Sequence, residues 1–200
     1  MPRYEALFLH AARQLGYFTV EQAHELGISS RMVLHHAGTG RFRRAARGVY
    51  RFRDFPDSYS DIPVAWLAVG RLTGGRAIVS HESALYLHDL GDVVPRAVDV
   101  LVERSDRRIR VPAHPPIRLR TTLAWPAESD IDSQGGALVT SPMRSLIDCL
   151  LARTEGQQLV QAYRQGRQRG WMPDPLLLAA AEARGPHSLS RVRALLAEAG

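Results

Sequence analysis

The chain has 200 residues, enough for one large domain or two small ones, and its 45% hydrophobic and 23% charged residues are the balance of an ordinary globular protein. No apolar run approaches the ~20 residues that a membrane span needs, and the first residues lack the apolar stretch of a signal peptide, so we expect a cytoplasmic protein. The single cysteine, Cys149, cannot build a disulfide framework or a zinc knuckle.

The basic residues are unusual in kind and in position. All 26 are arginine, and the absence of lysine excludes mechanisms that need one, such as a P-loop, a pyridoxal phosphate Schiff base or a nuclease with a catalytic lysine. Residues 1–53 contain nine arginines and three acidic residues, whereas the rest of the chain contains 17 of each. This basic module, followed by a neutral one, predicts an anionic partner for the first quarter of the chain.

Three short helices are expected at the start of the chain. The first is amphipathic and ends at Gly16, because apolar side chains recur at helical spacing: Tyr4, Leu7, Phe8, Ala11, Ala12 and Leu15. Residues 19–22 (TVEQ) have the pattern of a capping box that begins a second helix, which runs to Leu26. Gly27 then supplies a turn, and Ser29 caps a third helix that runs to about Ala37. Two short helices joined by a tight glycine turn form a helix-turn-helix unit, whose second helix normally enters the major groove of DNA.

The third helix is therefore the candidate recognition helix. Val33 and Ala37 share one face, which we expect to point into the core. The candidate DNA-contacting residues of this segment are Ser29, Ser30, Arg31, Met32, His35 and His36. Among these we expect Ser30, Arg31 and His35 to contact bases. Arg31 lies in the first turn, and an arginine there can read guanine with two hydrogen bonds, worth ~1–3 kcal/mol of discrimination.

A basic hairpin follows the three helices. Apolar residues alternate with arginines on both sides of a turn that ends at Gly48, which predicts two short strands. We expect its exposed arginines to hold phosphates: Arg41, Arg43, Arg44 and Arg47. Residues 1–54 are thus predicted to form a winged helix-turn-helix DNA-binding domain. The alternative is a small helical domain with a solvated basic hairpin.

The rest of the chain, residues 62–200, is predicted to be a mixed α+β domain with a helical C-terminal half. Residues 54–63 are turn-rich and acidic, which indicates a linker. The pattern predicts a short buried run at 77–79, strands at 97–102, 117–121 and 135–139, and helices at 65–71, 83–88, 143–153, 156–169, 174–183 and 188–198. The fold class of the whole chain is therefore α+β.

Motifs in the second module resemble catalytic ones only in part. Residues 81–85 begin like the zinc peptidase motif, but Leu85 stands where that motif needs its second histidine. A triad of Ser80, His81 and Asp148 stays open, although no nucleophile elbow supports it. The simpler interpretation makes Ser80 a helix cap and His81 a residue bonded to nearby backbone. We expect no catalytic residue, no metal and no cofactor.

Three segments in the same order resemble the AbiEi-type antitoxins of type IV toxin-antitoxin systems. They are residues 27–51 (GIS, then TGRF, then RGVYR), residues 80–85 (SHESAL) and residues 139–148, with the VTSP run followed by Arg144, Leu146 and Asp148. The resemblance implies a winged helix that binds inverted repeats in its own promoter and represses it, as a homodimer if the operator is palindromic. It also implies a second domain that opposes a nucleotidyltransferase-type toxin, with or without direct contact.

Three other functions remain open from the sequence. The first is a DNA-directed nuclease or hydrolase, of the Vsr-like type that occurs fused to such winged helices, with His81, Glu82, Asp99 and Glu103 as its reactive residues. The second is an orphan winged-helix regulator without a toxin. The third is a protein-interaction module whose basic hairpin binds an acidic partner instead of DNA.

Overall fold

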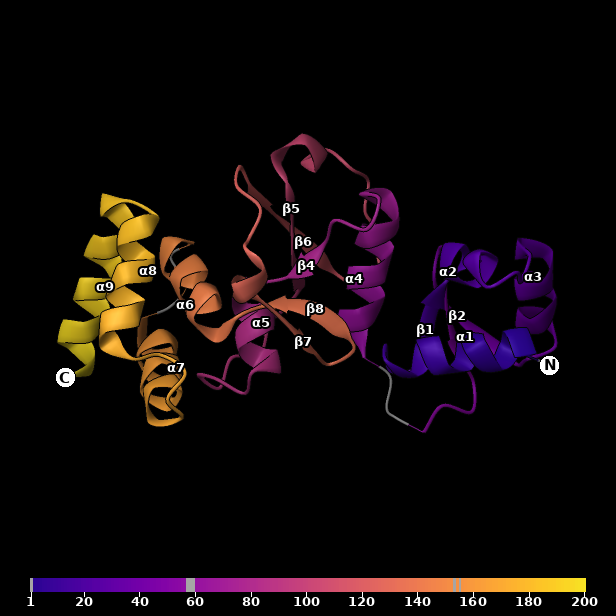
Figure 1. The fold of residues 1–200 in the computed structure, drawn as a ribbon, viewed down its shortest axis with the longest axis horizontal. Helices are drawn as coiled ribbons and strands as arrows, with labels where there is room; N and C mark the ends of the chain where they lie inside the picture. Colours follow the sequence, from indigo (N-terminus) through magenta and orange to yellow (C-terminus); the bar gives the residue numbers. More distant parts are fainter. Residues whose placement is uncertain (1, 57–59, 153, 155) are drawn as a thin grey trace.

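The computed structural model describes residues 2–56, 60–152, 154 and 156–200. The molecule is elongated, with a small helical and stranded module at the N-terminal end, a larger sheet in the middle and a group of helices at the C-terminal end (Figure 1). In these ranges no helix has both the length and the apolar character required to cross a membrane. The predicted residues 57–59 of the linker, and 153 and 155 in the helical half, lie outside the described residues.

The N-terminal module contains the expected three helices and hairpin, with one further strand. Its elements are α1 (Pro2–Ala12), β1 (Tyr17–Thr19), α2 (Val20–Glu25), α3 (Ser30–Gly38), β2 (Phe42–Ala46) and β3 (Val49–Phe52). The strands form an antiparallel sheet in the order β1-β3-β2. Sequence reasoning missed β1 because its three residues are all buried and show no alternation of polar and apolar side chains.

Caps and turns set the ends of these helices. The Thr19 hydroxyl accepts a hydrogen bond from the Gln22 N–H at 3.2 Å, and the Gln22 side chain accepts one from the Thr19 N–H at 2.8 Å, which confirms the capping box. Ser29 caps α3 by accepting from the Met32 N–H at 3.3 Å. The turn between α2 and α3 requires Gly27, whose φ of +77° lies in the left-handed region.

Aromatic side chains form the core between the helices and the sheet. Leu7 of α1, Phe18 of β1, Val33 of α3 and Phe42 of β2 are almost completely buried there. The rings of Phe18 and Phe42 meet edge to face, with centroids 4.9 Å apart. This core holds α3 against β2 and leaves the opposite side of α3 in solvent.

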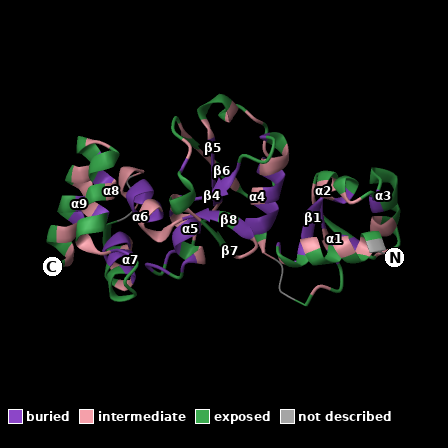
Figure 2. Ribbon diagram, viewed as in Figure 1, coloured by how far each residue is buried: buried purple, intermediate pink, exposed green. Residues whose placement is uncertain are grey.

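Helix α4 (Asp61–Leu72) packs against both sheets of the molecule. Val64, Leu67 and Ala68 cover Tyr17 and Val49 on the open face of the N-terminal sheet. One helical step away, Ile62, Ala65 and Val69 pack against the larger sheet. Both apolar stripes are buried, and α4 is coloured largely as buried in Figure 2, whereas the outer face of α9 is exposed.

The larger sheet has five strands in the order β6-β5-β4-β8-β7. They are β4 (Ile78–Val79), β5 (Val98–Glu103), β6 (Ile117–Thr122), β7 (Ile131–Gln134) and β8 (Ala137–Thr140), with short 3-10 turns η1 (Arg104–Asp106) and η2 (Glu128–Asp130). Pairing is parallel for β5 with β6 and for β4 with β8, and antiparallel elsewhere. The edge strand β7 was not predicted, because its last three residues are polar and exposed.

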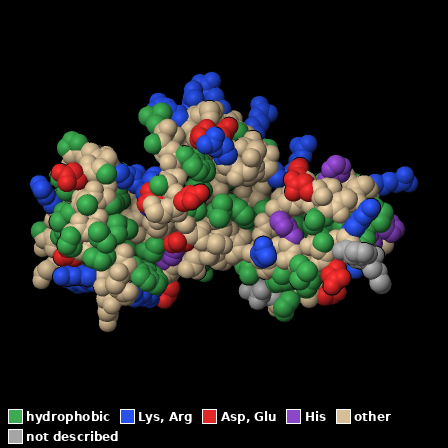
Figure 3. Space-filling view, in the orientation of Figure 1, with side chains coloured by type: hydrophobic (Ala, Val, Ile, Leu, Met, Phe, Trp, Pro, Cys, Tyr) green, Lys and Arg blue, Asp and Glu red, His purple; other side chains and the backbone are tan. Residues whose placement is uncertain are grey.

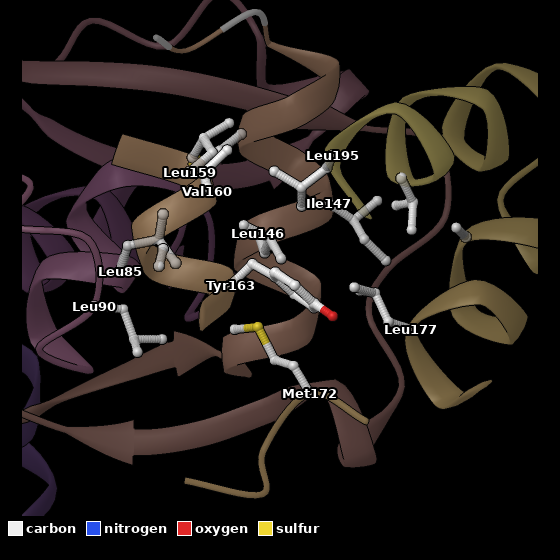
Figure 4. Close-up of a cluster of buried hydrophobic side chains, with 14 of the residues drawn as sticks. Leu85, Leu90, Leu146, Ile147, Leu159, Val160, Tyr163, Met172, Leu177 and Leu195 are labelled. Atoms are coloured by element: carbon white, nitrogen blue, oxygen red, sulfur yellow. The ribbon is translucent and has the colours of Figure 1, made fainter. Parts of the chain in front are cut away.

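The remaining helices of the second module lie on the side of this sheet opposite α4 (Figure 1). They are α5 (His81–Leu87), α6 (Pro142–Leu151), α7 (Gly156–Gln168), α8 (Asp174–Ala183) and α9 (Pro186–Ala199), close to the predicted ranges. Their apolar faces meet in one cluster drawn in Figure 4, which includes Leu85, Leu146, Tyr163, Leu177 and Leu195. This cluster makes the C-terminal half a packed helical group and confirms the α+β class.

Candidate nucleic-acid interface

The exposed side of α3 and its cap residue carry five of the ten residues predicted to contact DNA. Val33 is fully buried and Ala37 partly buried, so the inner face is as expected. The exposed residues of the segment are Ser29, Ser30, Arg31, Met32, Leu34 and His35. Leu34, which is 59% exposed, was not predicted, and with Met32 it gives this surface an apolar component. Apolar groups of this kind can contact the methyl group of thymine, and arginine and serine side chains such as Arg31 and Ser30 can donate hydrogen bonds to base edges.

His36 does not lie with this exposed group. Its Nε2 is 2.6 Å from the Tyr4 hydroxyl of α1, and its ring packs edge-on to Phe42 at 5.5 Å. Burial lowers the pKa of His36, and the nearby charges of Arg41 and His35 lower it further. The structure therefore gives His36 a packing role between α1, α3 and β2.

The hairpin arginines are divided between the two faces of the sheet. Tyr17, Arg51 and Arg43 are aligned across the three strands, so their side chains share the face that α4 covers. Phe18, Tyr50 and Arg44 are aligned one residue further along, on the face that the helices cover. Since α3 contacts β2, Arg44 lies on the same side of the sheet as α3, and Arg43 lies on the other side.

The other two hairpin arginines are anchored by different parts of the chain. The Arg41 guanidinium lies 5.0 Å from the centre of the Tyr4 ring, against α1. Arg47 is exposed in the two-residue turn, but its carbonyl accepts a hydrogen bond at 2.5 Å from Arg71 of α4. Arg71 also binds the carboxylate of Glu21 at the start of α2. The ion pair between Arg71 and Glu21 could not be predicted from the sequence, because the two residues are 50 positions apart.

Basic side chains are not confined to the N-terminal module. Figure 3 shows arginines projecting from the end that carries α3 and also from the region where β5 connects to β6. The connection contains four exposed arginines, at positions 104, 107, 108 and 110. The charge count missed this group, because summing over the whole second module cancels a local excess against distant acids.

The four residues of the nuclease alternative each have a different environment. Asp99 is fully buried, with Oδ1 at 2.7 Å from Arg120 Nε, and burial raises the pKa of its carboxyl. Glu103 pairs with Arg76 at 2.7 Å, and Glu82 accepts a hydrogen bond from Thr154 at 3.1 Å. Among the described residues, no group of three or more histidine, cysteine, aspartate or glutamate side chains is arranged to hold a metal ion.

Ser80 and His81 are in contact, but not as predicted. Ser80 is the N-cap residue of α5, as expected, but its side chain makes no cap hydrogen bond, and its hydroxyl lies 2.9 Å from His81 Nδ1. The prediction that His81 bonds to nearby backbone is therefore wrong, since its ring contacts a side-chain hydroxyl instead. Asp148, the third member of the possible triad, is held by Arg144 at 3.0 Å and Arg184 at 2.6 Å. Ser80 is completely buried, so its hydroxyl is out of reach of a substrate.

Comparisons with known proteins found similarity to a solved structure and to a family model. A search of curated proteins gave no match. Among solved structures, the chain is similar to the crystal structure of the RV2827C protein from Mycobacterium tuberculosis, with a TM-score of 0.57 and 16% sequence identity over 100% of this chain and 78% of that one. That likeness is one of fold, and it extends over both modules. Residues 5–53, which form α1 to β3 with the exposed α3 surface, match the model of the AbiEi antitoxin family of transcriptional regulators.

Proposed function

We propose that this protein is a cytoplasmic, non-catalytic transcriptional repressor that binds DNA upstream of its own gene. The exposed side of α3 carries this proposal, because it presents Ser30, Arg31 and His35 on a helix whose other side is fixed in an aromatic core. The match of residues 5–53 to a family of transcriptional regulators supports it. Arg44, on the same side of the sheet, would hold a phosphate beside the recognition helix.

The test is fluorescence anisotropy of the full chain with two labelled duplexes at two salt concentrations. One duplex is the DNA upstream of the gene, and the other is the same sequence scrambled. We expect tight binding to the upstream DNA alone, and we expect it to persist at the higher salt. Equal binding to both duplexes that is lost at higher salt would contradict sequence-specific repression, since that behaviour is typical of phosphate contacts alone.

We further propose that the protein is the antitoxin of a nucleotidyltransferase-type toxin, with the second module, residues 62–200, as the part that opposes the toxin. The antitoxin family matched by residues 5–53 supports this extension. The test is co-expression of the full chain with the product of a neighbouring nucleotidyltransferase gene, and growth rescue is the expected result. A variant with Arg31→Ala should still rescue growth, because the change lies in the DNA-binding module, and loss of rescue in that variant would count against the division of roles.

A homodimer is the expected form on DNA if the operator contains inverted repeats, because a two-fold operator matches a two-fold protein. Analytical ultracentrifugation with and without the operator duplex measures this directly. Two chains on each duplex are expected, and a single chain on a duplex with both repeats would contradict the proposal.

A further inference from the structure

A cavity of about 430 Å³ opens in the second module, away from the DNA-binding surface. The ends of β5 and β6, the first residue of α5, helix α6 and the end of α8 surround it. Three arginines line it, Arg120, Arg144 and Arg184, together with Asp148 and His81. Leucine side chains form another part of the wall. Its size and its mixture of apolar wall and convergent polar groups are typical of sites for small molecules, which occupy roughly 300–1,000 Å³.

The charges of this cavity favour an anion. Its three arginines and one aspartate give the lining a net charge of +2 when His81 is neutral. Outside the lining, Asp99 pairs with Arg120 and with Arg118, and Asp130 pairs with Arg144, so the wider cluster keeps an excess of one positive charge. The guanidinium groups are partly withdrawn from solvent, with side chains 23%, 10% and 27% exposed for Arg120, Arg144 and Arg184. Positive charge in such a recess attracts anions more strongly than it does on an open surface, because water screens it less.

The arginines also keep hydrogen-bond donors unused. Arg120 uses its Nε on Asp99, and Arg184 uses its Nη1 on Asp148. The remaining N–H groups of these two side chains have no acceptor within the described part of the chain. Because a guanidinium carries five donors in a planar fork, each can still bind an oxyanion while its carboxylate partner holds it in place.

His81 supplies a neutral donor at the same cavity. The residue is only 9% exposed, and its φ of +52° lies in the left-handed region, which is a strained conformation for histidine. Nδ1 contacts Ser80, whereas Nε2 has no hydrogen-bond partner in the described ranges. Burial lowers the pKa of His81 to about 4, so the ring is neutral at physiological pH. When Ser80 donates to Nδ1, Nε2 carries the proton and can donate it to a ligand.

We propose that this cavity binds a small organic phosphate, for which AMP serves as a probe. A terminal phosphate would accept hydrogen bonds from Arg120, Arg184 and His81, and its double negative charge would match the lining. The leucine wall would pack against the uncharged part of the ligand. A recess of this size admits the phosphate of a small molecule better than the backbone of a rigid duplex. The proposal is independent of the DNA-binding role of α3.

Isothermal titration calorimetry of the full chain tests this with three probes: inorganic phosphate, AMP and adenosine. We expect phosphate and AMP to bind and uncharged adenosine not to bind. Arg184→Gln should weaken AMP binding about ten-fold or more, since a hydrogen bond from a charged donor is lost. The fold should persist, because Arg144 still holds Asp148. The matched control is Arg193→Gln, which removes an exposed arginine from α9 and should leave the affinity unchanged.

A second variant keeps the proposal testable if Arg184→Gln fails to fold. His81→Asn removes the Nε2 donor, and asparagine tolerates a left-handed backbone better than most residues. It should weaken AMP binding as well. The proposal is overturned if neither phosphate nor AMP binds at about 1 mM, or if both variants bind AMP as the wild type does. It is also overturned if operator DNA displaces AMP, since the cavity would then be a nucleic-acid contact.

Discussion

Arg71 of α4 donates two hydrogen bonds to the carboxylate of Glu21 in α2, from Nε to Oε2 at 2.6 Å and from Nη2 to Oε1 at 2.7 Å. Its Nη1 donates to the carbonyl of Arg47 in the hairpin turn. The hydrogen bond from Arg71 lowers the pKa of Glu21, and the same bond raises that of Arg71. One side chain of the second module thereby joins the start of α2 to the turn of the β2–β3 hairpin.

Replacing Arg71 with alanine should loosen this junction. Because Glu21 is 54% exposed, we expect a loss of only about 1 kcal/mol in the free energy of unfolding. The local effect should be clearer. The Val20 N–H donates to the Gly48 carbonyl in the turn of the β2–β3 hairpin at 3.0 Å, and in the variant this amide should exchange faster with solvent.

Hydrogen exchange measured by NMR gives this readout. The control is Arg76→Ala, which removes an arginine whose ion pair, with Glu103 of β5, lies within the second module. Equal exchange rates of the Val20 amide in the two variants would show that Arg71 does not stabilise the contact between α2 and the turn of the β2–β3 hairpin.

The capping box should make Thr19 important for stability. Thr19→Ala removes the acceptor for the Gln22 N–H, and the expected cost is ~1 kcal/mol in chemical denaturation. Ser60→Ala is the control, since Ser60 stands at the equivalent position of α4 but its side chain makes no cap hydrogen bond. A similar loss in both variants would contradict the role given to the cap.

The buried His81 should make stability fall in mild acid. Its pKa is 6.5 when unfolded and about 4 in the fold, so the unfolded chain binds the proton more readily between these values. Stability from this residue is complete above pH 6.5, declines as the pH falls, and amounts to about 3 kcal/mol in total.

Urea unfolding at pH 7 and pH 5 tests the prediction with His81→Asn. From pH 7 to pH 5 the wild type should lose about 2 kcal/mol more than this variant. His187→Asn, a change at an exposed position in α9, should follow the wild type. An identical pH dependence in the wild type and His81→Asn would refute the assignment.

Neighbouring hairpin arginines should differ in their effect on DNA binding. Arg44→Ala should weaken binding to all duplexes and make the slope of log K against log salt less steep by about 1, from a wild-type value of about −4 to −5. Arg43→Ala removes the same charge one residue earlier, but its side chain shares the face covered by α4, so its effect should be smaller. Equal losses would mean that DNA contacts both sides of the hairpin.

Base recognition should depend on Arg31. Arg31→Ala should reduce the preference for the operator over scrambled DNA by about 1–3 kcal/mol, while general affinity falls less. Competition anisotropy with both duplexes measures the two quantities separately. If the variant keeps full discrimination, Arg31 does not contact bases and can only contact phosphates.

Local chemistry made much of this fold predictable. The capping residues Thr19 and Ser29 and the turn at Gly27 carry their signal within a few positions, so α2 and α3 were located closely. The exposed side of α3 followed from helical periodicity alone. The division of Arg43 and Arg44 between faces was not predictable, because it depends on strand pairing and on what covers each face. The contact that holds His36 among the core side chains was not predictable either, because its partner Tyr4 lies 32 positions away in the sequence.

The cavity of the second module could not be found from sequence. Arg120, Arg144 and Arg184 lie on three different elements, and nothing in their spacing indicates that they converge. The pattern around Ser80 and His81 suggested a cap, because a serine before a helix usually has that role. Instead, His81 adopts a left-handed backbone and the Ser80 hydroxyl contacts its imidazole, and neither feature has a signal in the local sequence.

Because helix α4 packs against both sheets, it limits where the chain can be truncated to give a soluble fragment. A fragment that stops at residue 54 would expose Tyr17 and Val49 to water, and one that stops after Leu72 would expose the stripe formed by Ile62, Ala65 and Val69. Either truncation leaves an apolar surface that favours aggregation. Soluble expression of the N-terminal module together with α4 therefore calls for polar substitutions at Ile62, Ala65 and Val69, and the intact chain is the better starting material for crystals.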